Sequence, residues 1–153
     1  MRPLQRLLAT VTRRHDEDGS AVIEAVVGVP AFMLFVGLII FGGRTIMAHQ
    51  AVESAAGDAA RTASIARSAG DASGTATAAG AASLKNQQVQ CITQSVTVDT
   101  AGFSAPVGTP ARVMATVTCR VNLSDLSVPG VPGSLTVTES ATSPIDTFRG
   151  KTR

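Results

Sequence analysis

One carboxylate stands where the sequence changes from charged to apolar. Glu24 lies five residues after Gly19 and one turn into an otherwise apolar segment. A carboxylate there costs ~2.5–3.5 kcal/mol at the centre of a membrane and less near its surface, so it needs a partner. If the chain were cut after Gly19, Ser20 would carry a free α-amine, and Glu24 could pair with such an amine on a neighbouring subunit. Alternatively, Glu24 reaches the lipid headgroups and interacts with the positive end of its own helix.

Other residue types that carry chemistry are few and scattered. His15 and His49 have no Ser or Cys partner suited to a catalytic triad. The only lysines, Lys85 and Lys151, lie in polar contexts, whereas a catalytic lysine is desolvated. Gly150-Lys151-Thr152 imitates the end of a phosphate-binding loop, but Ile145 replaces its first glycine. The four aspartates after residue 70 are too dispersed for a metal cage: Asp71, Asp99, Asp125 and Asp146. We therefore expect no enzyme, metal or cofactor.

Composition narrows the class further. The 153 residues suit one small domain, with 44% hydrophobic but only 3% aromatic residues. A net charge of +2, without basic clusters interleaved with aromatics, argues against nucleic-acid binding. Two isolated cysteines do not form a structural zinc site. These counts favour a membrane-tethered or exported protein.

Residues 25–43 predict a transmembrane helix. They are nineteen consecutive uncharged residues, which as a helix span ~28 Å and nearly match a hydrocarbon core of ~30 Å. The apolar part of a cleaved secretory signal is shorter, at roughly 7–15 residues. Four arginines precede the run and only Arg44 closely follows it, which places the N-terminus in the cytoplasm. We expect a cytoplasmic leader at 1–19, a transmembrane helix at 20–43, an alanine-rich stalk helix at 44–69 and an extracytoplasmic domain at 70–153.

Pro30 lies inside the predicted span, where it removes a backbone donor and can kink the helix. The bend could help helices to pack in an assembly, or Pro30 could be a proline in an ordinary anchor.

The predicted stalk carries small apolar residues at spacings of three and four. They form one stripe of the helix: Ala48, Val52, Ala55, Ala59, Ala63 and Ala66. The stripe could line a core of packed helices from several subunits, or it could pack on the protein's own sheet, an alternative favoured for the half nearer Ala69. Residues 75–87 predict a shorter second helix or a partly ordered linker, in which Gly80 is unfavourable.

Strict alternation after residue 86 predicts strands at 95–98, 113–121 and 135–139. The fold class is therefore α+β, with a long N-terminal transmembrane and stalk helix, a short second helix and a small three-stranded antiparallel sheet. Antiparallel pairing would bring together Cys91, at the start of the first strand, and Cys119, near the end of the second. Outside the cytoplasm we expect a disulfide between them, worth ~3–4 kcal/mol.

The N-terminal signature resembles that of TadE-like proteins, the minor pilins (pseudopilins) of the tight-adherence pilus machinery. In that family a glycine and a glutamate five residues later open the transmembrane helix, a proline follows, and an arginine-ended, alanine-rich helix with A-A-R leaves the membrane. The matching positions here are Gly19, Glu24, Pro30, Arg44 and Ala59-Ala60-Arg61. Ala25 stands where such prepilins usually carry an aromatic residue. The run from Thr97 to Cys119 is also similar to actinobacterial members.

The resemblance implies a structural role in building or priming an adhesive pilus. Its implied partners are the membrane, sibling pilins, an assembly platform with its ATPase, and a prepilin peptidase acting at Gly19 and Ser20. The alternative is a single-pass anchored extracytoplasmic binding or adhesion domain without a pilus role. An anchored hydrolase is disfavoured because the catalytic constellations are missing.

Overall fold

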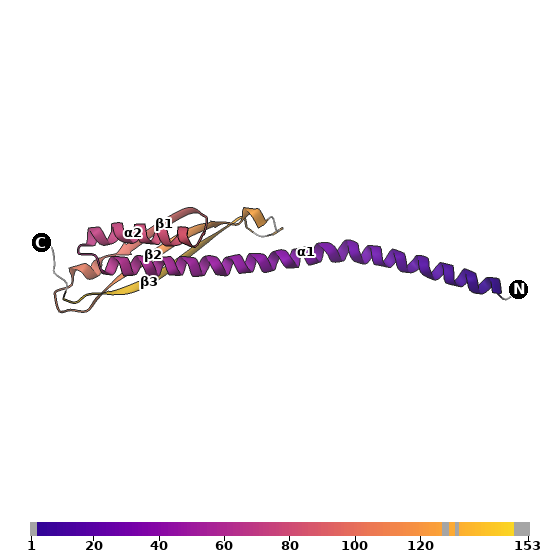
Figure 1. The fold of residues 1–153 in the computed structure, drawn as a ribbon, viewed down its shortest axis with the longest axis horizontal. Helices are drawn as coiled ribbons and strands as arrows, with labels where there is room; N and C mark the ends of the chain where they lie inside the picture. The colour runs from indigo at the N-terminus through magenta and orange to yellow at the C-terminus, as the bar shows by residue number, and fades with distance from the viewer. Residues whose placement is uncertain (1–2, 127–128, 131, 149–153) are drawn as a thin grey trace. The chain divides into compact units, whose positions relative to one another are not determined.

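The computed structural model describes residues 3–126, 129–130 and 132–148, with side chains from residue 22 onward. It divides into two compact units, residues 1–40 and residues 41–153. The first helix, α1 (Pro3–Ser64), begins in the first unit and ends in the second. Figure 1 shows the elements of the second unit, α2 and three strands, next to the C-terminal part of α1.

In the first unit the described backbone is α1 alone. Leucine, isoleucine, phenylalanine and methionine fill the segment after Val29, and α1 continues through Pro30 without interruption. Proline removes one backbone donor and crowds the preceding turn, so it is unfavourable inside a helix in water. Apolar surroundings favour a helix here because a helix satisfies nearly all backbone groups within the segment itself.

The second helix, α2 (Ala69–Asn86), has well-defined ends. The Ser68 hydroxyl accepts a hydrogen bond from the Asp71 amide at 3.1 Å, which caps the first turn, and the Asp71 carboxylate interacts favourably with the helix dipole. At the other end Gln88 adopts a φ of 57°, and the Val89 amide donates to the Leu84 carbonyl at 3.2 Å. This is the left-handed helix ending that glycine usually provides.

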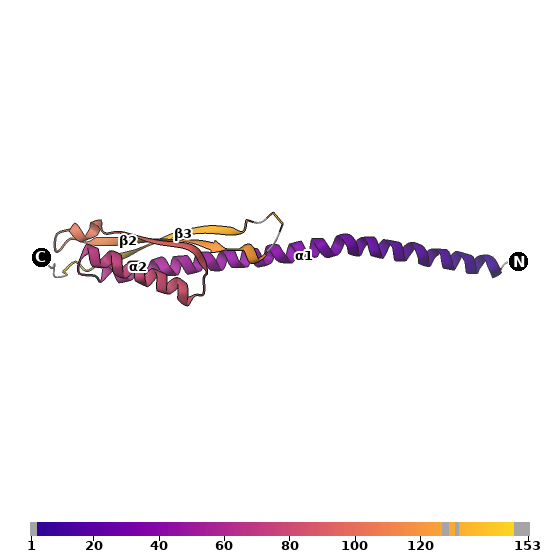
Figure 2. The same cartoon turned by 90° about the horizontal axis from the view of Figure 1, so that it is seen from above.

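The strands form one antiparallel sheet in the order β1-β2-β3, namely β1 (Cys91–Asp99), β2 (Ala111–Asn122) and β3 (Ser134–Ile145). β2 pairs with β3 in an unbroken register from Ala111 opposite Ile145 to Asn122 opposite Ser134. β1 pairs with β2 with one irregularity between Cys91 and Thr93. Figure 2 shows the strands as a layer beside the helices.

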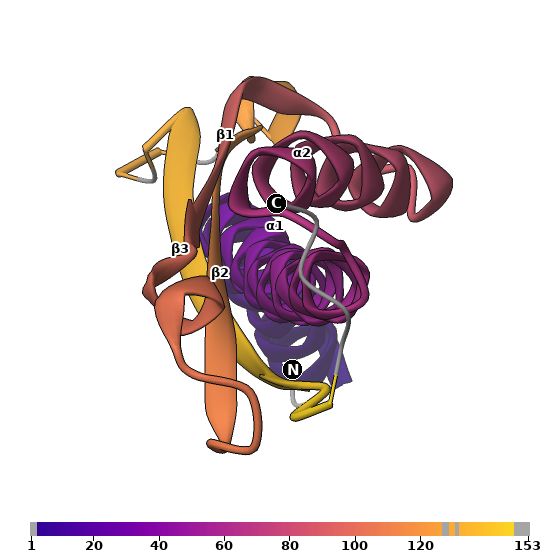
Figure 3. The same cartoon turned by 90° about the vertical axis from the view of Figure 1, so that its left-hand side faces the viewer.

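The core lies between one face of the sheet and the two helices, as Figure 3 shows in a view along α1. Alternate residues of β2 point into this core and are buried: Val113, Ala115, Val117, Cys119 and Val121. The largest fully buried side chain is Leu84 of α2. Most of the surface that the helices contribute is alanine, so the helices approach the sheet closely but bury few large side chains.

Gly80 explains how α2 comes so close. A Cβ atom at this position would lie 3.1 Å from Val96 Cγ2, and 3.6 Å from both Ala59 Cβ and Val117 Cγ2. The sequence predicted Gly80 to be a weak point of the second helix. Its missing side chain instead lets α2 contact α1, β1 and β2 at a single position.

The predicted α+β fold class is confirmed, with corrections to the ends of the elements. α1 ends at Ser64 instead of continuing to Ala69, and α2 begins at Ala69, before the predicted start at Thr75. All three strands extend beyond their predicted limits, β3 most of all, because its alternation continues through Pro144 to Ile145. Proline is tolerated there because β3 is an edge strand.

Candidate functional site

The most unusual surface of the protein is the apolar part of α1. Between Val22 and Ile40 every large apolar side chain except the half-buried Val36 is 45–69% exposed, and these side chains lie on all sides of the helix. A helix that is apolar all round is stable only in a lipid bilayer or inside a bundle of other helices. By length and composition, α1 is a candidate membrane anchor.

The predicted processing residues all lie within α1. Gly19 and Ser20 are helical, and the Ser20 side chain lies outside the described part of the structure. Glu24 is exposed among apolar neighbours, and among residues with described side chains it forms no ion pair. Its carboxylate is therefore the one charge on an otherwise apolar surface from Val22 to Gly43.

The disulfide predicted between Cys91 and Cys119 is present in the structure. The two Cα atoms lie 5.4 Å apart, and Cys119 is fully buried in the core. The strand register places Cys91 opposite Val121, and the irregularity after Cys91 accompanies the diagonal link to Cys119. The bond thus joins the beginning of β1 to the end of β2, next to α2.

An ion pair and a histidine–carboxylate contact join residues 44–49 of α1 to the rest of the second unit. Arg44 Nη1 lies 2.6 Å from Asp125 Oδ2, and His49 Nδ1 lies 2.8 Å from Glu139 Oε1. Both pairs are partly exposed, and such pairs contribute only ~0–1 kcal/mol. These two contacts could not be predicted from the sequence because the partners lie 81 and 90 residues apart and no local pattern links them.

The alanine stripe packs inside the protein's own domain. Its residues from Ala48 to Ala63 are buried against the sheet and α2, and Ala66 packs at the edge of the same core. The prediction that this stripe could line a core shared between subunits is therefore wrong. Because these methyl groups are already covered, any contact of α1 with another subunit must use a different face of the helix.

A cleft of about 410 Å³ lies between residues 44–48 of α1 and the connection from α2 to β1. Arg44 and Met47 line one wall. The others mix carboxamides with apolar side chains, from Gln87, Gln88, Gln90 and Asn122 and from Val89, Val121 and Leu123. Among the described residues that line the cleft, the charged ones are Arg44 and Asp125, which pair with each other. The carboxamides can offer hydrogen bonds to a bound group.

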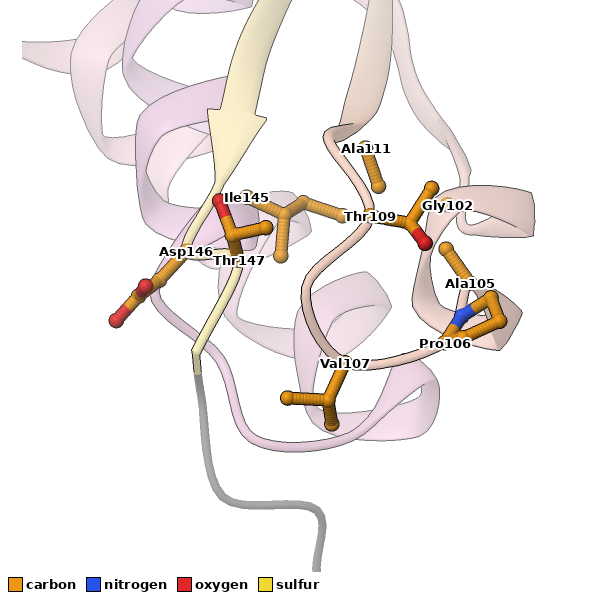
Figure 4. Close-up of a pocket in the computed structure, with 9 residues that line it drawn as sticks. All are labelled: Gly102, Ala105, Pro106, Val107, Thr109, Ala111, Ile145, Asp146 and Thr147. Carbon is orange, nitrogen blue, oxygen red and sulfur yellow. The ribbon is translucent and has the colours of Figure 1, made fainter.

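Figure 4 shows a second, much smaller pocket at the end of β3, next to the short helix η1 (Ala101–Ser104). Its volume of about 10 Å³ is close to that of a single water molecule, so it cannot hold a substrate. Gly102 lines this pocket. A glycine suits this position because a Cβ atom there would overlap the carbonyl oxygen of Arg112. Among the described residues, no group of three or more His, Cys, Asp or Glu side chains could hold a metal ion.

The fold and site thus define a protein with one exposed apolar helix that continues into a small α+β domain stapled by a disulfide. Residues 19–61 match the profile of the family described as TadE-like protein, which confirms the resemblance drawn from the sequence. The match ends at Arg61, so α2 and the sheet lie outside it. Neither the curated proteins nor the solved structures give a match. The family points to a protein related to pilus assembly with an N-terminal apolar helix.

Proposed function

We propose that this protein is a membrane-anchored TadE-like minor pilin or pilus-assembly component with a structural role in building or priming a tight-adherence pilus. The observation that carries the proposal is the coincidence of two ranges. The TadE-like match covers residues 19–61, and the apolar side chains from Val22 to Ile40 within it remain exposed. An exposed apolar helix suits a subunit that is first held by lipid and later by other helices.

The proposed topology is a single pass with the N-terminus in the cytoplasm and the C-terminus outside. The excess of arginine before the apolar run supports this orientation. The disulfide between Cys91 and Cys119 supports it independently, because such bonds persist mainly outside the cytoplasm. The leader is then 1–19 and the transmembrane segment 20–43, and the helix from residue 44 to its end at Ser64 belongs to the extracytoplasmic domain.

The proposed processing step is cleavage after Gly19 by a prepilin peptidase. Ser20 then carries a new α-amine, and Glu24 of one subunit pairs with the amine of a neighbour. An unpaired carboxylate is unfavourable in lipid, so this pairing favours one helix register over others. Pro30 supplies a weak point at which the helix can bend during packing.

The proposed partners are sibling pilins, the membrane platform and its assembly ATPase. Since residues 22–40 present apolar side chains on every side, they can contact several helices at once. The second unit adds a stable contact surface outside the membrane.

The proposal is tested by sequencing the N-terminus of the mature protein from membranes of cells that contain the cognate peptidase. We expect Ser20 as the first residue. Gly19→Val should leave the leader intact, and Gly28→Ala, a glycine substitution within the span, should not. An intact leader in the unsubstituted protein would contradict the processing step.

The role of Glu24 is tested with Glu24→Gln, which keeps the size of the side chain and removes its charge. We expect normal membrane insertion and normal cleavage, but reduced piliation. Normal piliation with this variant would show that Glu24 does not set the register.

A further inference from the structure

One face of α1 in the domain has no neighbour among the described residues. We call it the open face of α1, and it consists of Ile46, Gln50, Glu53, Ser54, Gly57 and Arg61. The His49 to Glu139 contact with β3 marks one border of this face. The hydrogen bond from Ser83 Oγ to Asp58 Oδ2, at 2.7 Å, marks the other border, on the side of α2. Figure 3 shows the sheet and α2 on two sides of α1 and no other described element on the third.

Opposite charges lie on the two flanks of the open face. Glu53, Gly57 and Arg61 follow one another at intervals of four residues, and each interval turns the helix by about 40° beyond a full turn. Glu53 therefore lies on one flank and Arg61 on the other, with Gly57 between them. Both charged side chains are exposed, and neither forms an ion pair with a described residue.

We propose that the open face of α1 is the contact surface for a second copy of this chain, which packs in parallel with a stagger of eight residues. Membrane anchoring keeps the copies parallel, and to that extent the inference rests on the proposed function. Side by side in register, two copies would leave Glu53 and Arg61 at different heights. A stagger of eight residues, about 12 Å along the helix, brings the Arg61 flank of one copy beside the Glu53 flank of the next.

The same stagger accommodates two features that the isolated domain leaves unexplained. Glycine is unfavourable in a helix interior, yet a Cβ atom at Gly57 would have nothing within 4 Å. Ile65, the first residue after the end of α1, is 82% exposed. In the staggered pair Ile65 of one copy reaches the level of Gly57 of the other, where the missing side chain leaves room. Because each copy uses a different flank, the contact is heterologous and can repeat into a ring or a filament.

The proposal is tested in membranes by cross-linking full-length copies that carry different tags and single reporter cysteines. Ile46 and Ser54 are eight residues apart and lie on opposite flanks, so Ile46→Cys and Ser54→Cys leave both charges in place. With a short bismaleimide we expect a mixed dimer between the two variants. Either variant paired with itself should give at least fivefold less product. Equal or stronger self-pairing, or no mixed product, would overturn the proposal.

Charge reversal tests the ion pair within the same assay. Glu53→Arg or Arg61→Glu, introduced into all copies, should lower the mixed product by roughly fivefold, and the two reversals together should restore it. Gly57→Leu should abolish the product, whereas Gly74→Leu, at a glycine of α2 that is equally open, should not. No restoration by the double reversal, or equal effects of the two leucines, would count against the stagger.

The outcomes also separate this inference from the proposed function. A mixed dimer in a protein that keeps its leader and does not affect piliation would retain the staggered contact and refute the pilin role. If the chain is cleaved before Ser20 and piliation depends on the protein, but no mixed dimer forms, the pilin role is supported and the staggered contact is refuted.

Discussion

Removal of the disulfide should be one of the largest stability changes available in this domain. The bond closes a loop across a sequence separation of 28 residues. The chain-entropy relation for a loop of that size gives about 3.5 kcal/mol at 25 °C. Cys119 is also fully buried, so its replacement removes packing as well. Against a total stability of ~5–15 kcal/mol for a small domain, this loss is a large fraction.

The change is Cys91→Ala together with Cys119→Ala, made in the full chain in detergent. Unfolding in urea is followed by circular dichroism, because the chain has no tryptophan or tyrosine. The free energies of unfolding must be compared, not only the midpoints, because the denatured chain expands when the link is lost and the slope with urea changes.

We expect the double variant to be less stable by about 3–4 kcal/mol, and the unsubstituted protein after reduction to lose a similar amount. A loss below about 1 kcal/mol in both cases would refute the reasoning. It would mean that the reduced, unfolded chain is already held compact or that the link strains the native sheet.

Four further substitutions test the packing and one exposed ion pair. Leu84→Ala should cost about 3 kcal/mol in urea unfolding because it empties the largest buried position, whereas Ile92→Ala, at a half-exposed side chain, should cost less than about 1 kcal/mol; equal costs would contradict the assigned core. Gly102→Ala should lower the free energy of unfolding by about 1–3 kcal/mol, and the midpoint of thermal unfolding by several degrees, because its Cβ atom would overlap the Arg112 carbonyl. An unchanged midpoint would show that η1 is free to move. Asp125→Asn should change the free energy of unfolding by less than about 1 kcal/mol, since its ion pair is exposed. A loss above about 2 kcal/mol would show that the ion pair contributes strongly to stability and would contradict this expectation.

Local patterns predicted most of the fold. The alternation in β2 is strict over its whole length, and the buried positions of the strand are those that the alternation assigns to one face. The disulfide followed from the strand order, because an antiparallel pair brings the start of one strand to the end of the next. These features depend on residues close in sequence or on a single pairing rule.

The start of α2 was predicted too late, although the sequence holds a signal for it. Gly70 and Gly74 are unfavourable in a helix, but Ser68 followed three residues later by Asp71 is a helix-capping pattern, and the Ser68 hydroxyl accepts from the Asp71 amide as that pattern predicts. Burial of small residues such as Ala72 then outweighs the low helix propensity of the glycines.

The contacts that join α1 to the sheet could not be predicted from local patterns. Asp125 pairs with Arg44, and His49 contacts Glu139, although nothing near any of these residues in the sequence marks a partner. These pairs depend on how the helix lies on the sheet. That placement follows from many weak alanine contacts and has no marker in the sequence near either partner.

The burial of the alanine stripe also determines which part of the helix remains for assembly. An alanine stripe in a helical stalk suits close packing equally well on its own sheet or on another subunit, so its sequence pattern cannot separate the two. In the structure the sheet and α2 cover this stripe, and the border contacts of His49 and Asp58 hold neighbouring elements against both sides of α1. Among the described residues, no other element covers the face through Glu53, Gly57 and Arg61. The small residues therefore stabilise the domain, and recognition between subunits passes to the charged residues that flank Gly57.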